Sequence, residues 1–108
     1  MRPYEVMVIF DADLEDDVIR AAVDRHAKLL ESKGAELGSV DHWGKRRLAY
    51  QLKHRLEGYY VVLQARAEPA AMDELGRALS LADEVLRHKV LRIPEQIYGK
   101  SARAATDN

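Results

Sequence analysis

Hydrophobic and polar positions alternate along the start of the chain with the two-residue period of a strand. The large apolar side chains that share one face of this segment are Tyr4, Val6, Val8 and Phe10. Their alternation, in a stretch rich in β-branched and aromatic residues, predicts a strand over residues 4–10. Because side chains point to the two faces of a strand in turn, Met7 and Ile9 lie on the other face.

A helical period follows and predicts a helix over residues 15–33. Its apolar stripe consists of Val18, Ala21, Ala22, Leu29 and Leu30. Asp13 is the expected N-cap, and three carboxylates in the first turn suit the positive end of the helix dipole. Lys33 and Gly34 predict the end of the helix, as a basic last turn followed by a glycine.

Two further strands are predicted over residues 37–52 and 59–67, joined by a turn around Glu57 and Gly58. Gly38 and Gly44 interrupt the first of them, and we expect bends or bulges there. Alternating apolar side chains near the end of this strand are expected to anchor it in the core. They are Leu48, Tyr50 and Leu52.

The rest of the chain predicts a second helix and a last strand. Pro69 suits the first turn of the helix, and a turn at Asp83 and Glu84 leads into a strand over residues 85–93. The inward stripe of the helix is Met72, Leu75, Ala78 and Leu79. From Gln96 onward no apolar period remains, so we expect a single domain of residues 1–95 and a flexible tail of residues 96–108.

The order of these elements favours an α+β fold, the ferredoxin-like split βαβ sandwich, because connections are short and crossovers right-handed. In this βαββαβ arrangement two helices cover one face of a four-stranded antiparallel sheet, and the first strand lies centrally. Its uniformly large Tyr4 face is expected to meet the helices. Met7 and Ile9 then lie on the open face, which predicts either a protein interface or a shallow apolar floor under longer side chains.

The charges nearly cancel, with 17 lysines and arginines against 18 acidic residues, but they are unevenly distributed. No acid lies between Asp41 and Glu57, and this window holds the unopposed cations Lys45, Arg46, Arg47, Lys53 and Arg55. A second window without acids holds Arg87, His88, Lys89 and Arg92. These windows predict either two basic patches that bind anions or two solvated strand faces.

The sequence holds no assembled active site. The absence of cysteine excludes disulfides, thiolate metal sites and cysteine nucleophiles. An acylphosphatase-like hydrolase would need an amide beside an arginine near the start, but the only asparagine is Asn108. The histidines, which lack metal-site spacing and are expected at the surface, are His26, His42, His54 and His88. We therefore expect no enzyme activity, metal, cofactor or small-molecule substrate, and no membrane segment, because the apolar runs are short.

The strongest local pattern is the segment 44–53, where a glycine and three consecutive cations precede the alternating apolar residues. An arginine can grip a phosphate with two parallel hydrogen bonds. Because neighbouring strand residues point to opposite faces, Arg46 and Arg47 grip different surfaces, and alternation places Arg46 with Leu48.

At this segment the chain resembles a known family, that of the sixth protein of the bacterial small ribosomal subunit. The residues that match the family pattern there are Gly44, Lys45, Arg46, Arg47, Leu48, Ala49, Tyr50 and Leu52, the last in place of the usual isoleucine. Residues 1–5, 58–60 and 85–88 are also similar to that family, so the resemblance covers about residues 1–93. The tail lacks the acidic extension of some relatives.

The resemblance implies the sandwich fold, no enzymatic activity, and a structural role in the cytoplasmic ribosome. It implies binding to the central domain of 16S-type ribosomal RNA beside the eighteenth small-subunit protein. We expect the RNA-binding residues to be Arg2, Lys45, Arg46, Arg47, Lys53, Arg87 and His88, and the protein interface to include Met7 and Ile9. The alternatives are a free-standing RNA- or protein-binding module and a ligand-sensing regulatory domain.

Overall fold

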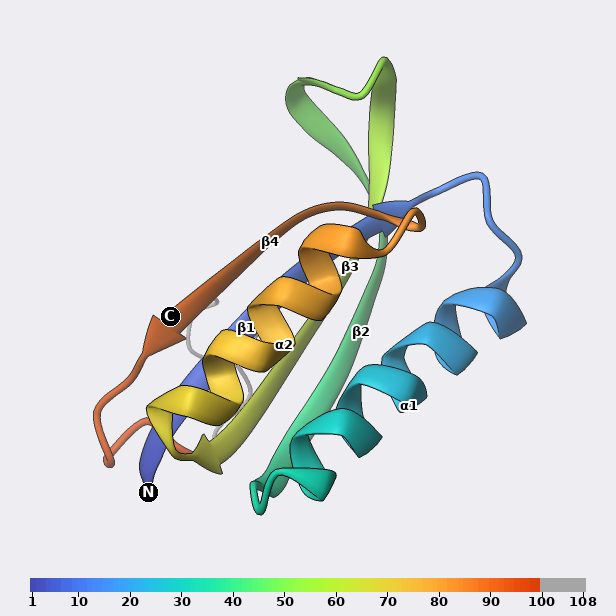
Figure 1. Cartoon of the computed structure of the whole chain (residues 1–108). Coiled ribbons are helices and arrows are strands. Elements are labelled where there is room, and N and C mark those ends of the chain that lie inside the picture. The colour runs from blue at the N-terminus through green and yellow to red at the C-terminus, as the bar shows by residue number, and fades with distance from the viewer. Residues whose placement is uncertain (100–108) are drawn as a thin grey trace.

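The two layers of the fold follow from the alternation of its central strand. The structure is a computed structural model that describes residues 1–99, so Lys100 to Asn108 of the expected tail lie outside the described residues. Its elements are β1 (Arg2–Asp11), α1 (Asp16–Ser32), β2 (Glu36–Leu52), β3 (Arg55–Ala67), α2 (Pro69–Leu81) and β4 (Val85–Arg92). The antiparallel sheet has the order β2-β3-β1-β4, and both helices cover one of its faces (Figure 1). The predicted fold class is confirmed.

The core lies between the sheet and the helices. The Tyr4 face of β1 belongs to it, with Val6 fully buried and Phe10 1% exposed, so the predicted orientation of β1 is confirmed. The helices contribute mainly Ile19, Ala22, Val23, Leu30, Ala71, Met72, Leu75 and Leu79. Burial of each large side chain stabilises the fold by about 1.5 to 3 kcal/mol before entropy is counted.

The start of α1 differs from the prediction. Glu15 occupies the N-cap position without a side-chain hydrogen bond, and Asp13 lies in the preceding turn. Asp13 is therefore not the cap, because Arg55 binds its carboxylate instead. The inward stripe is also rotated by about one residue, so that Val18 and Ala21 are exposed and Ile19 and Val23 are buried.

His26 is the one predicted surface histidine that the structure buries, at 5% exposure. Its Nδ1 lies 2.7 Å from the carbonyl oxygen of Ala22, one turn earlier in α1. The rotation of the stripe explains the error, because it turns His26 toward the sheet together with Val23 and Leu30.

The hairpin of β2 and β3 turns at Lys53 and His54, not around Glu57 and Gly58 as predicted. Both turn residues have positive φ, which gives a two-residue hairpin turn whose twist suits the strands. The expected bulges are confirmed: the register shifts after Leu37 and again at Gly44, where φ is +87°.

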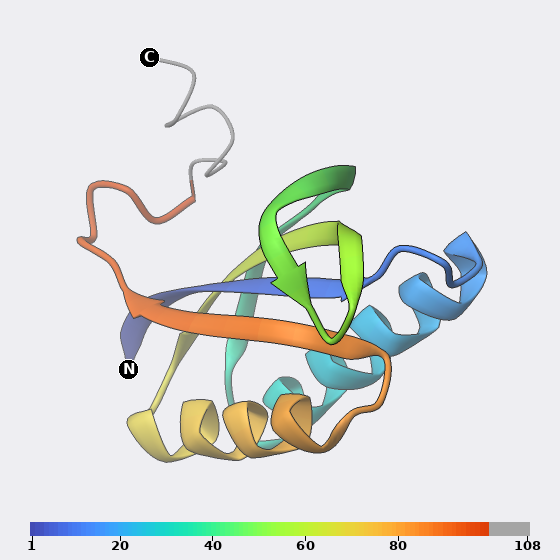
Figure 2. The ribbon, with the colours of Figure 1, turned by 90° about the horizontal axis from the view of Figure 1, so that it is seen from above.

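The end of this hairpin bends over the open face of the sheet, opposite the helices (Figure 2). Leu48 is therefore buried near Ile9 and Gly58, at 9% exposure and apart from the helix-side core, and Tyr50 is 60% exposed. Leu52 also lies outside the helix-side core, so the prediction of core anchors is wrong for Tyr50 and Leu52, while Leu48 is buried on the opposite face of the sheet. Gly58 permits the close approach, because a Cβ there would collide with the Ile9 side chain.

Residues 94–99 leave β4 and pack against the other end of the open face. The guanidinium of Arg66 lies 4.4 Å from the centre of the Tyr98 ring, and Gly99 donates a hydrogen bond to the side chain of Gln64. Glu95 forms an ion pair with Arg66 at 2.6 Å. The boundary of the domain stays a prediction. Within residues 1–99, neither helix has the length and apolarity needed to cross a bilayer.

Candidate nucleic-acid interface

The basic segment of β2 lies on the bent hairpin, beyond the helix-covered part of the sheet (Figure 1). Lys45, Arg46 and Arg47 are all exposed, and their neighbours across the hairpin are Tyr59, Gly58 and Glu57. None of the three forms an ion pair with any residue between 1 and 99. This cluster is therefore available to anions outside the molecule.

Arg46 differs from its two neighbours, because an aromatic side chain supports it. Its guanidinium lies 5.3 Å from the centre of the Trp43 ring. The Trp43 ring stacks in turn on Tyr60, with ring centres 6.2 Å apart and planes within 9° of parallel. The alternation with Leu48 holds, but it places Arg46 on the open face rather than in the core.

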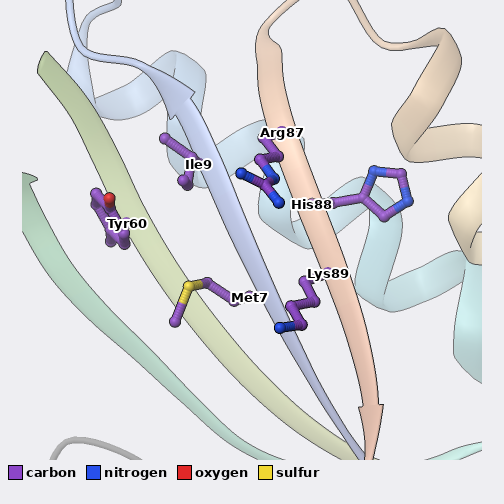
Figure 3. Close-up of a pocket in the computed structure, with 6 residues that line it drawn as sticks. All are labelled: Met7, Ile9, Tyr60, Arg87, His88 and Lys89. Atoms are coloured by element: carbon purple, nitrogen blue, oxygen red, sulfur yellow. The ribbon is translucent and has the colours of Figure 1, made fainter. Parts of the chain in front are cut away.

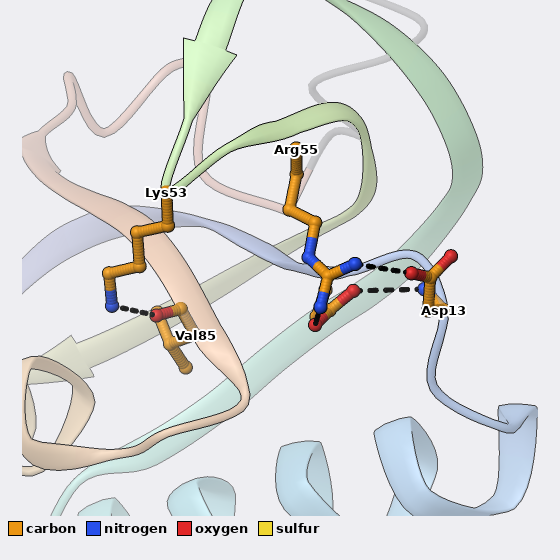
Figure 4. Close-up of polar contacts among 5 residues, drawn as sticks. Asp13, Lys53, Arg55 and Val85 are labelled. Atoms are coloured by element: carbon orange, nitrogen blue, oxygen red, sulfur yellow. Dashed lines mark hydrogen bonds and ion pairs between the residues drawn. The ribbon is translucent and has the colours of Figure 1, made fainter.

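The other two cations of the first window have partners within the protein (Figure 4). The ammonium of Lys53 donates a hydrogen bond of 3.1 Å to the carbonyl oxygen of Val85, which ties the turn to the start of β4. Arg55 pairs with Asp13 at 2.5 Å and with Asp11 at 3.2 Å. Arg55 is thus not unopposed, because the acidic segment after β1 neutralises it.

The second window of cations divides between the two faces of β4 (Figure 3). Arg87 and Lys89 point over the open face, next to Ile9 and Met7 of β1, whereas His88 points to the helix side. There the His88 ring lies beside α2, 3.8 Å from the place that a Cβ of Gly76 would take. His88 is therefore separated by the sheet from the two cations beside it.

Met7 and Ile9 form the floor of a hollow of about 130 Å³ on the open face, which Tyr60, Arg87 and Lys89 also line (Figure 3). Met7 is half-buried and is accessible from the hollow. Ile9 is only 8% exposed, because the bent hairpin covers it. Arg87 also donates a hydrogen bond to the hydroxyl of Tyr50, which joins the hairpin to β4.

Arg2 lies at the far end of the sheet from the basic hairpin. It pairs with Ala67 in the register of β1 and β3, whereas Phe10, opposite Tyr59, lies at the hairpin end of β1. Eight residues of extended strand separate the two ends by about 26 Å. Arg2 and the hairpin cations therefore cannot contact the same phosphate.

Burial is the main cause of three pKa shifts at the sheet. Burial raises the pKa of Glu5 on the open face, and the nearby charge of Asp41 acts in the same direction. On the helix side, burial lowers the pKa of His88. Burial also lowers the pKa of His42, where the Arg20 charge acts in the same direction.

The structure adds three aromatic residues to the site that sequence reasoning missed, namely Trp43, Tyr60 and the exposed Tyr50. The signal available in the sequence was the tryptophan directly before Gly44, in a chain with one tryptophan. Over the described part of the chain, histidine and acidic side chains form no cluster that could hold a metal ion. The arrangement is that of a binding surface, with cations around an apolar and aromatic floor.

Comparisons with known proteins agree with the fold and identify the family. The family model of Ribosomal protein S6 matches residues 3–92. The small ribosomal subunit protein bS6 of Desulforamulus reducens is 44% identical over 92 residues, which cover 85% of this chain and 97% of that protein. Its counterpart in Mycolicibacterium paratuberculosis is 45% identical over 92 residues, covering 85% of this chain and 96% of that protein.

Solved structures give the same result. The crystal structure of 30S ribosomal protein S6 from Thermotoga maritima superposes with a TM-score of 0.82, at 26% identity and 97% coverage of both chains. The C-terminal domain of MgtC from Mycobacterium tuberculosis, at a TM-score of 0.58, 17% identity and coverage of 88% of this chain and 90% of that one, shares the fold alone. With a family match across residues 3–92, this chain belongs to the ribosomal protein S6 family.

Proposed function

We propose that this chain is a structural constituent of the small ribosomal subunit in the cytoplasm, where it binds 16S-type ribosomal RNA of the central domain and is not an enzyme. The single observation that carries the proposal is the exposed group Lys45, Arg46 and Arg47 on the bent hairpin, which has no ion-pair partner among residues 1–99. Their charges can neutralise RNA phosphates at no cost to internal ion pairs. The names of the relatives supply the ribosomal context.

Within this proposal the cations have different roles. Lys45, Arg46 and Arg47 bind phosphates directly, and Arg87 adds a contact beside them on the open face. Lys53 contributes charge while it holds the turn against β4. Arg2 binds a separate stretch of RNA at the far end of the sheet. The His88 ring faces α2, so His88 affects RNA binding only through its neighbours on β4, Arg87 and Lys89.

We propose further that the open face binds the eighteenth small-subunit protein. Support comes from the hollow over Met7 and Ile9, whose apolar floor is only partly covered by the hairpin. Burial of the remaining exposed part of Met7 by a partner would favour association by less than about 1.5 kcal/mol before ordering costs, because the side chain is already half-buried. Ile9 contributes less accessible surface and serves mainly to shape the floor.

The test of RNA binding compares two double variants with the same change in charge. Lys45→Ala with Arg47→Ala should weaken binding to a central-domain transcript and reduce the slope of log affinity against log salt by about 0.7 to 0.9 for each phosphate that is no longer neutralised. The control is Lys28→Ala with Arg77→Ala, which removes two cations from the exposed sides of α1 and α2. Equal salt slopes for the two variants would contradict the proposal.

A second test separates the ribosomal role from the alternatives. The wild-type chain should sediment with small ribosomal subunits after a high-salt wash. A chain that stays in the supernatant as a soluble oligomer with a bound metabolite would instead support a ligand-sensing regulatory domain. RNA binding without retention on the subunit would support a free-standing binding module.

A further inference from the structure

We infer that the stacked rings of Trp43 and Tyr60 position Arg46. Arg46 is then the oriented phosphate ligand of the basic hairpin, whereas Lys45 and Arg47 bind phosphate through side chains that no ring holds in place. This inference rests on the proposed RNA-binding function and deepens it. It makes Trp43 and Tyr60 positioning residues, which act through Arg46 and need not touch RNA.

The bulge in β2 builds this arrangement. Gly44 has a φ of +87°, a value that residues with a side chain rarely adopt, and the register between β2 and β3 shifts there. The shift allows Trp43 and Arg46 to lie on the same face, with the guanidinium and the Tyr60 ring both next to the Trp43 ring. Tyr60 is itself held in the middle of β3, opposite Ile9 of β1.

A guanidinium over an aromatic ring uses its flat face for the contact and keeps the N–H donors along its edge free. Those donors match two oxygens of a phosphate. Arg46 is exposed and has no ion pair within the described chain, so its edge is open to a ligand. Because the ring already restricts its rotamers, binding of a phosphate costs less conformational entropy.

Lys45 and Arg47 lack this support. They point to the other side of β2, and neither forms a cation–π contact in the part of the chain that the structure describes. Both carry flexible side chains that must be ordered upon binding. The three cations are consecutive in the sequence, but in the structure an aromatic ring supports Arg46 and not its two neighbours.

The indole of Trp43 lowers the stability of the fold in one respect, which is consistent with a role in positioning Arg46. Its Nε1–H is buried and has no hydrogen-bond partner among residues 1–99. A leucine would also be apolar there, although smaller, and would have no unpaired donor. What leucine lacks is the π face that attracts a cation, and tryptophan provides the strongest of these faces.

The experiment is a double-mutant cycle, read by binding to a central-domain ribosomal RNA transcript in the presence of the eighteenth small-subunit protein. Trp43→Leu should weaken binding by about two- to fivefold, and Trp43→Phe by less, because phenylalanine keeps a π face. Arg46→Ala should weaken binding by about tenfold or more. In the Arg46→Ala background, Trp43→Leu should have no further effect.

A matched cycle with Lys45→Ala is the control, and there the effect of Trp43→Leu should be undiminished. Urea melts of each variant correct for any decrease in the folded fraction. Emission of Trp43, the single tryptophan, should change in free Arg46→Ala protein, because the cation leaves its ring. Additive effects of Trp43→Leu and Arg46→Ala, or unchanged emission, would overturn the inference while RNA binding stands. A wild-type chain that binds no transcript would overturn the proposed function as well.

Discussion

The two faces of β1 show how one strand serves both folding and binding. On the helix side, Val6, Val8 and Phe10 are between 0% and 3% exposed and belong to the core. On the open side, Ile9 is buried only because the hairpin bends over it, and Met7 remains half-buried. Apolar burial on the first face is a requirement of the fold. On the second face it is incomplete, which leaves surface for a partner.

The open face is itself divided by charge. Its hairpin end carries Arg46, Arg87 and Lys89, and its other end carries Glu5 and the docked residues 94–99. A ligand that reaches both ends therefore meets cations at one and a carboxylate at the other. The helix side of β1 offers no such contrast, since its residues are covered.

The largest expected effect separates the two faces directly. Phe10→Ala should lower the free energy of unfolding by about 3 to 5 kcal/mol, because it opens a cavity in the core. Met7→Ala should cost less than about 1.5 kcal/mol in stability but should weaken binding of the eighteenth small-subunit protein. Urea melts give the first quantity, and titration of the folded fraction with the partner gives the second. Equal decreases in stability for the two variants would erase the distinction between the faces.

An intermediate effect is expected at Ile9, where the two faces of β1 differ least in burial. Ile9→Asp should destabilise the protein by about 2 to 3 kcal/mol, because it places a carboxylate under the hairpin and removes buried apolar area. Met7→Asp is the matched control and should cost under about 1 kcal/mol, because its side chain can reach water. Urea melts at neutral pH measure both.

If the two aspartate variants unfold at the same urea concentration, the hairpin does not cover the open face in solution. In that case Ile9 would be as accessible to a partner as Met7. The comparison therefore also tests whether the bend of the hairpin persists in the free protein.

The period of apolar residues predicted the order of elements and the inward face of β1, because both depend on short-range alternation. It failed at the hairpin for a physical reason. Leu48 and Tyr50 alternate as core residues would, but the bulge at Gly44 bends their strand toward the opposite face of the sheet. A sequence pattern gives the alternation but not the face on which a bent strand ends.

The candidate site was predictable to a similar degree. The exposed cations of β2 were visible as an acid-free window, whereas the pairing of Arg55 with Asp11 and Asp13 depends on residues 42 or more positions apart. The support of Arg46 by Trp43 and Tyr60 likewise needs the register between two strands. Interactions across the fold, which one-dimensional patterns do not encode, determined which cations remain free.

The smallest expected effect concerns the pH dependence of Glu5 on the open face. Its pKa is raised above the ordinary 4.5, first by burial and then by the charge of Asp41, while the Gln64 side chain acts in the opposite direction. A raised carboxyl pKa in the folded state means that the folded protein binds the proton more tightly than the unfolded chain. Its contribution to stability is therefore complete below pH 4.5 and is lost as the pH rises through the folded value.

Glu5→Gln removes this pH-dependent penalty, so the variant should be more stable than wild type at pH 7, and the difference should vanish toward pH 4. The gain should stay below about 1 kcal/mol, because solvent screens a half-exposed carboxylate. Glu74→Gln, on the exposed side of α2, is the control for removing one negative charge. Urea melts between pH 4 and 7 decide the matter. A Glu5→Gln variant less stable than wild type at pH 7 would contradict this expectation. It would mean that the ionised Glu5 carboxylate stabilises the open face.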